Sequence, residues 1–321
     1  MRSFRIALLA ALLTVVGGCA AAVPPPPRVA ADQPGPKVPL TTVLSAVADA
    51  PAIRALPADL TPSLATAAED VGYNNEKCEA GPSDDRIEPC VFGDRASATD
   101  VVLYGDSHAG VWLPALTQIA ERLDWRLQFY GKPGCPTIDL AVWNQQEQRV
   151  FGECDRFRDF VAGRIAGTKP ELLIVTNESY SQKDGRGSVI DAGAWSSALG
   201  RTLRTLGKSA GHVVVLGDTP VLDQSAPECL AAHQDDVRAC STTRAAATAR
   251  TWNDADAAAA LTSGADYISV LPWVCTATCT AVIGNIAVYR NRFHLTGTYA
   301  RMLNGVLEDA LLKHFPSNAV P

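Results

Sequence analysis

The chain has 321 residues, of which 47% are hydrophobic and 19% charged, and its formal net charge is −6. This length and composition predict a globular protein with a sizeable core, in one large domain or two small ones. The acidic balance, with no run of Lys or Arg, argues against general nucleic-acid binding, which needs a basic surface.

The first residues predict export. A basic start precedes the apolar run Ile6–Val16, which is too short for a stable membrane-spanning helix and is followed by two glycines and Cys19. Val16–Cys19 resembles a bacterial lipoprotein box, in which the cysteine becomes the lipidated N-terminus. We therefore expect residues 1–18 to be a signal peptide and the protein to be lipid-anchored, on the outer face of the bacterial cytoplasmic membrane or in the periplasm. An ordinary signal peptide with a chance cysteine is the alternative.

Three further segments follow. Residues 19–40 are proline-rich, which predicts an extended tether. Residues 41–98 are irregular, with short helical patches at 41–50 and 62–69, and we expect them to form an N-terminal extension packed on the main domain. The main domain is expected over residues 99–315. No second run of about twenty apolar residues occurs, so no span is predicted in the mature chain.

The cysteines predict disulfide bonds. Setting Cys19 aside leaves eight of the nine cysteines, an even number in an exported chain. The simplest assignment joins neighbours in the sequence as four local disulfides: Cys78–Cys90, Cys135–Cys154, Cys229–Cys240 and Cys275–Cys279. A zinc site at the last pair is the alternative, but no nearby His or second close pair completes a tetrahedron. We therefore expect no metal and no catalytic cysteine.

Apolar, β-branched runs alternate with helical patterns from residue 99 onward. The runs lie at 101–104, 125–130, 172–175, 212–216 and 266–270, and the helical patterns at 111–123, 155–166, 194–206, 242–261 and 296–314. This alternation predicts a parallel sheet covered by helices on both faces. In such sheets the site lies beyond the carboxyl ends of the strands.

A serine occupies that position after the first run. The run ends abruptly in Gly105-Asp-Ser-His108, and a helical pattern follows. The first turn of a helix offers unpaired N–H groups and a positive dipole end to a developing oxyanion, so Ser107 is a candidate nucleophile. We expect Asp106 to cap the helix and His108 to pack beside the site, since the base for Ser107 should come from a distant segment.

Other segments reach the same edge of the sheet. Gly134 lies in a Gly/Pro turn after the second run, Asn177 follows the third, and His294 precedes the last helix. They suggest a base, His294, and three oxyanion donors: the N–H groups of Ser107 and Gly134 and the amide of Asn177. For Gly134 and Asn177, an ordinary turn role is the alternative. Four aromatic side chains could stack on a sugar or simply pack in the core: Trp112, Trp143, Trp273 and Tyr289.

Gly105-Asp-Ser-His108, Gly134-Cys-Pro136 and Asn291-x-x-His294-Leu are similar to motifs of the SGNH hydrolase superfamily. More narrowly, they resemble the periplasmic SGNH domain that is fused to, or partners with, acyltransferase-3 membrane proteins. The resemblance covers about residues 60–315. It implies a three-layer α/β/α sandwich with a five-stranded parallel, flavodoxin-like sheet. It also implies acyl-ester chemistry through an acyl-Ser107 intermediate, with no cofactor and with a possible membrane acyltransferase as partner.

One residue departs from that pattern. The family usually has Asp-x-x-His, whereas this chain has Asn291 three residues before His294. Replacing the triad carboxylate by an amide lowers the rate of a serine protease by about 10⁴. Three outcomes follow: a slower Ser–His dyad, a carboxylate supplied from elsewhere, or a non-catalytic, envelope-binding lipoprotein.

The expected function is transfer of an acyl (acetyl) group from Ser107 to a hydroxyl of a cell-envelope carbohydrate. Ser107, His294 and Asn291 are the candidate catalytic residues. Hydrolysis of a carbohydrate O-acetyl ester by the same site is the alternative. The acyl group, the glycan and the oligomeric state do not follow from the sequence.

Overall fold

The computed structural model describes residues 35–315, which belong to one compact unit beginning at Pro34. The predicted signal peptide, lipidated Cys19 and most of the tether lie outside the described residues. Within 35–315, no helix has both the length and the apolar character that crossing a membrane requires.

A six-stranded sheet lies at the centre of the fold, in the order β1-β3-β2-β6-β7-β9. Five strands run parallel: β2 (Asp100–Gly105), β3 (Arg126–Gly131), β6 (Leu172–Thr176), β7 (His212–Leu216) and β9 (Asp266–Ile268). Their order is the flavodoxin-like 2-1-3-4-5, so the predicted parallel sheet is confirmed. The order reverses between β2 and β6, and the site is expected at that point.

One strand was not predicted. Cys90–Gly93 forms β1, which pairs antiparallel with β3 at the edge of the sheet. The segment before residue 99 therefore contributes to the sheet as well as packing on it. The Cys78–Cys90 disulfide ties this edge strand to α2 (Asn75–Cys78).

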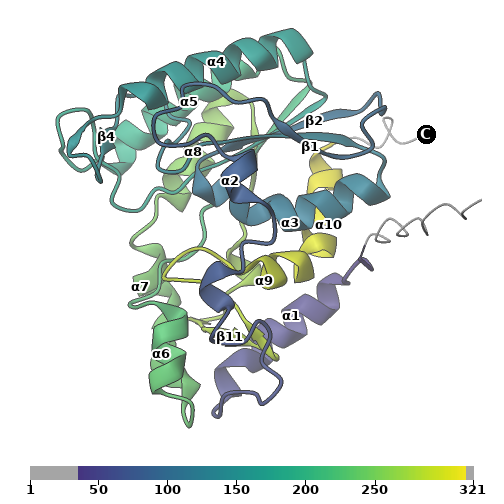
Figure 1. The fold of residues 1–321 in the computed structure, drawn as a ribbon, viewed down its shortest axis with the longest axis vertical. Helices are drawn as coiled ribbons and strands as arrows, with labels where there is room; N and C mark the ends of the chain where they lie inside the picture. Colours follow the sequence, from purple (N-terminus) through teal and green to yellow (C-terminus); the bar gives the residue numbers. More distant parts are fainter. Residues whose placement is uncertain (1–34, 316–321) are drawn as a thin grey trace, which may run out of the picture. The chain divides into compact units, whose positions relative to one another are not determined.

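Helices cover both faces of the sheet (Figure 1). One face packs on α4 (Gly152–Thr168), α5 (Ala192–Leu206) and α8 (Asn253–Ser263). The other packs on α1 (Leu40–Asp49), α3 (Ser107–Arg122), α9 (Gly297–Met302) and α10 (Asn304–His314). Successive residues of β2 point to opposite layers: Val101 and Leu103 to the α3 side, and Val102 and Tyr104 to the α4 side.

The remaining elements are short. They are α6 (Ala226–Ala232), α7 (Arg244–Thr248), the 3-10 helices Ala50–Ala52, Ala67–Glu69, Val237–Cys240 and Leu271–Trp273, and the strand pairs β4 (Trp143–Asn144) with β5 (Arg149–Val150), β8 (Thr242–Thr243) with β10 (Thr278–Cys279), and β11 (Val282–Ile283) with β12 (Ile286–Ala287). Cysteines are joined in the four pairs expected from the sequence.

Two predicted helices are interrupted. The pattern at 242–261 divides into β8, α7 and α8. Tertiary hydrogen bonds explain the break, because the Trp252 N–H donates to Ser179 Oγ and the Asn253 amide bonds to both backbone groups of Asp218. The final pattern divides into α9 and α10 around Leu303. In the helical patch predicted at residues 62–69, a short 3-10 helix forms over Ala67–Glu69.

Candidate active site

Ser107 is the first residue of α3, directly beyond the carboxyl end of β2. Asp106 caps the helix as expected: its Oδ1 accepts the His108 N–H at 2.9 Å. Its Oδ2 accepts the Glu178 N–H at 2.8 Å, so one carboxylate joins the segments that follow β2 and β6. Gly105 permits this close approach, since a Cβ there would lie 2.0 Å from the Thr176 carbonyl oxygen.

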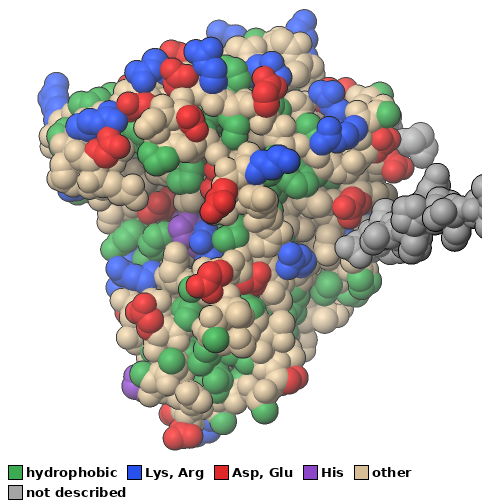
Figure 2. Space-filling model, viewed as in Figure 1, with side chains coloured by type: hydrophobic (Ala, Val, Ile, Leu, Met, Phe, Trp, Pro, Cys, Tyr) green, Lys and Arg blue, Asp and Glu red, His purple; other side chains and the backbone are tan. Residues whose placement is uncertain are grey.

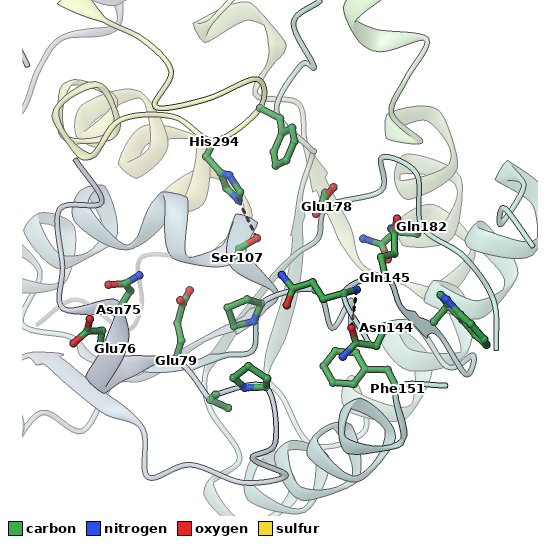
Figure 3. A pocket seen from close by; sticks show the side chains of 18 of the residues that line it. Asn75, Glu76, Glu79, Ser107, Asn144, Gln145, Phe151, Glu178, Gln182 and His294 are labelled. Carbon is green, nitrogen blue, oxygen red and sulfur yellow. Dashed lines mark hydrogen bonds between the residues drawn. The ribbon is translucent and has the colours of Figure 1, made fainter. Parts of the chain in front are cut away.

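The structure brings Ser107 and His294 together. Nε2 of His294 lies 2.9 Å from Ser107 Oγ, and both side chains line a pocket of about 550 Å³ (Figure 3). Geometry of this kind is what a nucleophile and its base require. A serine and a histidine far apart, or outside any cleft, would have argued against an enzyme. The observed distance and the shared pocket remove that argument.

Asn291 contacts the other nitrogen of the imidazole, with its Nδ2 2.9 Å from His294 Nδ1. The orientation of the amide is set by its oxygen, which accepts the backbone N–H groups of Phe293 at 3.0 Å and His294 at 2.9 Å. Turning the amide over would direct its NH₂ at two N–H donors. Nδ1 of His294 must therefore act as an acceptor, and the proton of the neutral ring resides on Nε2, facing Ser107.

This tautomer is the wrong one for general-base catalysis. A base must present a bare Nε2 to the serine hydroxyl, and a carboxylate beside Nδ1 normally ensures that it does. Asn291 favours the opposite proton position. No carboxylate from elsewhere replaces the missing one at Nδ1, since that nitrogen contacts Asn291.

A second imidazole with its own carboxylate lies against His294. His108 and Asp218 are buried, and Nδ1 of His108 lies 2.6 Å from Asp218 Oδ1. Burial alone would lower the pKa of His108, but the Asp218 carboxylate outweighs it and raises the pKa to about 9. The ring centroids of His108 and His294 are 4.7 Å apart. Asp218 was missed in the sequence, although it follows Gly217 at the end of a buried strand as Asp106 follows Gly105.

The pKa of His294 lies well below its usual value. The ring is buried, and the positive charges of His108 and Arg290 disfavour a further positive charge on His294. A base is active when unprotonated, so activity is lost only as the pH falls through this lowered pKa. We expect kcat/KM for ester hydrolysis to stay level through pH 6.5, the ordinary histidine value, and to decline only at more acidic pH. A pH series with thermal melts at each pH checks this; an acid limb at or above 6.5 with the fold intact would contradict it.

Ser107 and Gly134, two of the expected oxyanion donors, both line the pocket. Ser107 is at the start of α3, where a backbone N–H has no partner within the helix. Gly134 lines the same pocket, adopts φ +68°, and would place a Cβ within 4 Å of no other atom. A side chain there would be strained by the backbone and would enter the open space beside Ser107.

The expected role of Asn177 does not fit the structure. Asn177 is buried outside the pocket lining, its Nδ2 donates to Thr137 Oγ1 at 3.1 Å, and its Oδ1 accepts the Thr137 N–H at 2.7 Å. The amide is thus used to hold the turn that follows Gly134. Its neighbour Glu178 faces the pocket instead (Figure 3).

A buried lysine holds the other side of the Gly134 turn. Lys132 has no exposed surface, and its ammonium donates to the carbonyls of Gly81 at 2.5 Å, Pro82 at 3.1 Å and Asp84 at 2.9 Å. Gly81 and Pro82 also line the pocket. Lys132 therefore joins the N-terminal extension to the site. The sequence did not reveal this role, because the carbonyls that it binds belong to an irregular loop.

Two carboxyl groups in the pocket have pKa values raised into the neutral range. Burial raises the pKa of Glu79 to about 7, against a hydrogen bond of 2.7 Å from the Tyr73 hydroxyl and the charge of Arg290, which both lower it. Burial also raises the pKa of Glu178 to about 8, although the nearby charge of His108 opposes this.

Across residues 35–315, no group of three or more His, Cys, Asp or Glu side chains is arranged to hold a metal ion.

Of the four aromatic candidates, three belong to the core: Trp112, Trp273 and Tyr289. Trp143 lines the pocket. On the face shown in Figure 2, acidic and basic side chains are interspersed, and no broad basic patch is present.

Fold and site together define an SGNH-type α/β/α sandwich, with its serine after the first parallel strand and its histidine ahead of the last helices. Residues 75–309 match the family model described as "SGNH domain (fused to AT3 domains)", and the chain belongs to this family. A search of curated proteins found no match to the sequence.

Solved structures with a similar fold include the periplasmic domain of a lipopolysaccharide acetyltransferase from Salmonella ser. Paratyphi A. It is 15% identical, with a TM-score of 0.54, and the match covers 68% of this chain and 85% of that one. Axe2, an acetyl-xylooligosaccharide esterase from Geobacillus stearothermophilus, matches with 10% identity and a TM-score of 0.41 over 72% of this chain and 98% of that one.

Proposed function

We propose that this protein is a serine-dependent acyl-ester enzyme of the cell envelope that transfers an acyl group, of acetyl size, to a carbohydrate hydroxyl. The observation that carries the proposal is the 2.9 Å contact between Ser107 Oγ and His294 Nε2 inside the pocket. The chain belongs to a family described as fused to AT3 (acyltransferase-3) domains, and this membership supports acyl transfer.

In the first half-reaction, Ser107 Oγ attacks the carbonyl carbon of the acyl donor. His294 accepts the serine proton at Nε2 and returns it to the leaving group, and the N–H groups of Ser107 and Gly134 stabilise the oxyanion. In the second, a sugar hydroxyl attacks acyl-Ser107, which gives the O-acylated sugar and the free serine. If water attacks instead, the product is the free acid, and the enzyme is an esterase.

The starting tautomer makes this chemistry slow. Before His294 can accept the serine proton, its own proton must leave Nε2 and appear on Nδ1, against the preference imposed by Asn291. We therefore expect the missing carboxylate to lower the reaction rate, because His294 can act as a base only in its disfavoured tautomer.

The Asn291 orientation also favours a second candidate, a non-catalytic protein that binds envelope glycans in the same pocket. Both candidates place the protein outside the cytoplasm, as the four disulfides favour. Lipid anchoring at Cys19, and an acyl donor supplied by a membrane acyltransferase, remain part of the proposal.

The test is detection of the acyl-enzyme. The purified chain is incubated with p-nitrophenyl acetate, quenched in acid, digested and analysed by mass spectrometry. We expect an acetyl group on the peptide that contains Ser107, and we expect Ser107→Ala to remove both the adduct and the ester turnover. Ser225→Ala is the matched control, because Ser225 precedes α6 and does not line the pocket. Turnover that persists in Ser107→Ala would reject the enzyme and leave the binding protein.

A further inference from the structure

The pocket extends beyond the reacting atoms, and amide side chains line its far part. Asn144, Gln145 and Gln182 lie on the side of Ser107 away from Glu79 (Figure 3). We call these three residues the amide wall. Two come from the β4–β5 hairpin and one from the loop after β6.

The hairpin is held in place against that loop. Gln145 Nε2 donates to the Ser181 carbonyl at 3.1 Å, and the Trp143 N–H donates to the Lys183 carbonyl at 3.0 Å. Asn144 is buried within the hairpin, and its oxygen accepts two backbone N–H groups, those of Gln146 and Glu147. The wall is therefore preorganised, and binding a ligand there does not require the hairpin to fold around it.

Each member of the wall has hydrogen-bonding capacity left over. Asn144 uses its oxygen, so its NH₂ is the available end, whereas Gln145 uses its NH₂ and keeps its oxygen. Gln182 is only 5% exposed, and its side chain makes no hydrogen bond to any described residue. Glu178, between the wall and Ser107, likewise has no side-chain hydrogen-bond partner among residues 35–315. The polar atoms of Gln182 and Glu178 are therefore free to pair with a ligand in the pocket that they line.

This set of groups matches hydroxyls. A hydroxyl both donates and accepts, and the wall offers donors and acceptors side by side without a full charge. The lining does not favour an anionic ligand at or above pH 8: Glu76 is acidic, Glu79 and Glu178 also become ionised there because their pKa values are about 7 and 8, and Arg290 is the one Lys or Arg among the described lining residues. The charge of Arg290 is partly offset by its attraction to Glu79.

We propose that the amide wall, together with Glu178, is the acceptor subsite, and that it selects an uncharged saccharide through its hydroxyl groups. This inference rests on the proposed acyl transfer. Glu178 and Gln182 bind the sugar so that one hydroxyl reaches the carbonyl carbon of acyl-Ser107, and Trp143, in the same lining, offers an apolar surface to the ring.

The test measures acetyl transfer from p-nitrophenyl acetate to trisaccharides by the purified full chain. Maltotriose serves as the neutral acceptor, trigalacturonate as the anionic one and chitosan trisaccharide as the cationic one. We expect transfer to maltotriose and at least about tenfold less to the two charged sugars. Equal use of trigalacturonate would overturn the selection that we propose.

Variants test the residues. Gln182→Leu keeps the side-chain volume and should raise the KM for maltotriose by about tenfold, the value of one hydrogen bond of ordinary strength. Glu178→Ala should do the same, and Glu178→Gln should restore most of the loss, because an amide can also donate and accept. The control is Gln234→Leu, an exposed site outside the pocket, and thermal melts confirm folding of each variant.

The outcomes separate the two proposals. If no acetyl group forms on Ser107, the proposed function itself fails. If Ser107 is acetylated and sugars are acylated, but Gln182→Leu and Glu178→Ala leave the KM for maltotriose unchanged, the acceptor subsite lies elsewhere and this inference alone is wrong.

Discussion

Asn291→Asp is expected to raise ester turnover by up to about 10⁴, the factor that separates amide from carboxylate in a serine protease triad. In the variant, one carboxylate oxygen can still accept the N–H groups of Phe293 and His294, as the amide oxygen does now. The other oxygen then faces His294 Nδ1 as an acceptor. The ring proton moves to Nδ1, and Nε2 becomes free to accept the proton of Ser107.

The measurement is kcat/KM for p-nitrophenyl acetate in the native chain and the variant. Asn74→Asp is the matched control: it adds the same charge, Asn74 caps α2 through the Lys77 N–H, and Asp caps a helix equally well. The carboxylate should also raise the pKa of His294 and so move the acid limb of the pH profile to higher pH. Unchanged turnover would mean that His294 is not the base.

The second large effect concerns His294 itself and depends on the residue at position 291. In subtilisin, loss of the serine or histidine costs about 2 × 10⁶, whereas loss of the aspartate alone costs about 3 × 10⁴, which leaves roughly 10² for a histidine without its carboxylate. We therefore expect His294→Ala to lower kcat/KM by about 10² in the native chain. In Asn291→Asp, the same change should cost about 10⁶ and remove the whole gain.

This double-mutant cycle measures the coupling of the two residues directly. Ser107→Ala is run in both backgrounds to define the rate without the nucleophile, and thermal melts check the fold. Equal losses from His294→Ala in both backgrounds would show that residue 291 does not act through His294. The measured loss in the native chain also distinguishes a slow enzyme from a glycan-binding protein, for which it would be absent.

Much of the fold was predictable because it depends on local pattern. The continuous apolar runs of β2, β6 and β7 are typical of buried parallel strands, and the intervening periodicities of α3, α4 and α5 are typical of helices that cover them. The edge strand β1 was missed because four residues carry little pattern. The helix predicted at 242–261 was interrupted because Ser179 and Asp218 compete for backbone and side-chain hydrogen bonds at its centre.

Within the site, the sequence placed Ser107 and His294 but could not choose among the polar residues around them. Asn177 and Glu178 follow the same strand, and only contacts decide that the amide bonds to Thr137 while the carboxyl faces the pocket. Lys132 had no signal of its own, because the carbonyls that it binds are distant in the chain. Asp218 follows a buried strand, but nothing in the sequence pairs it with His108.

The sequence by itself determined the alternation of elements, the serine at the end of the first parallel strand and the departure at Asn291, since each follows from residue types in local order. Only the tertiary structure decided what that departure does. The backbone N–H groups of Phe293 and His294 hold the Asn291 oxygen, which leaves the amide nitrogen facing His294. The direction of one hydrogen bond therefore sets the proton position on the base, and that direction depends on how a loop folds rather than on which residues it contains.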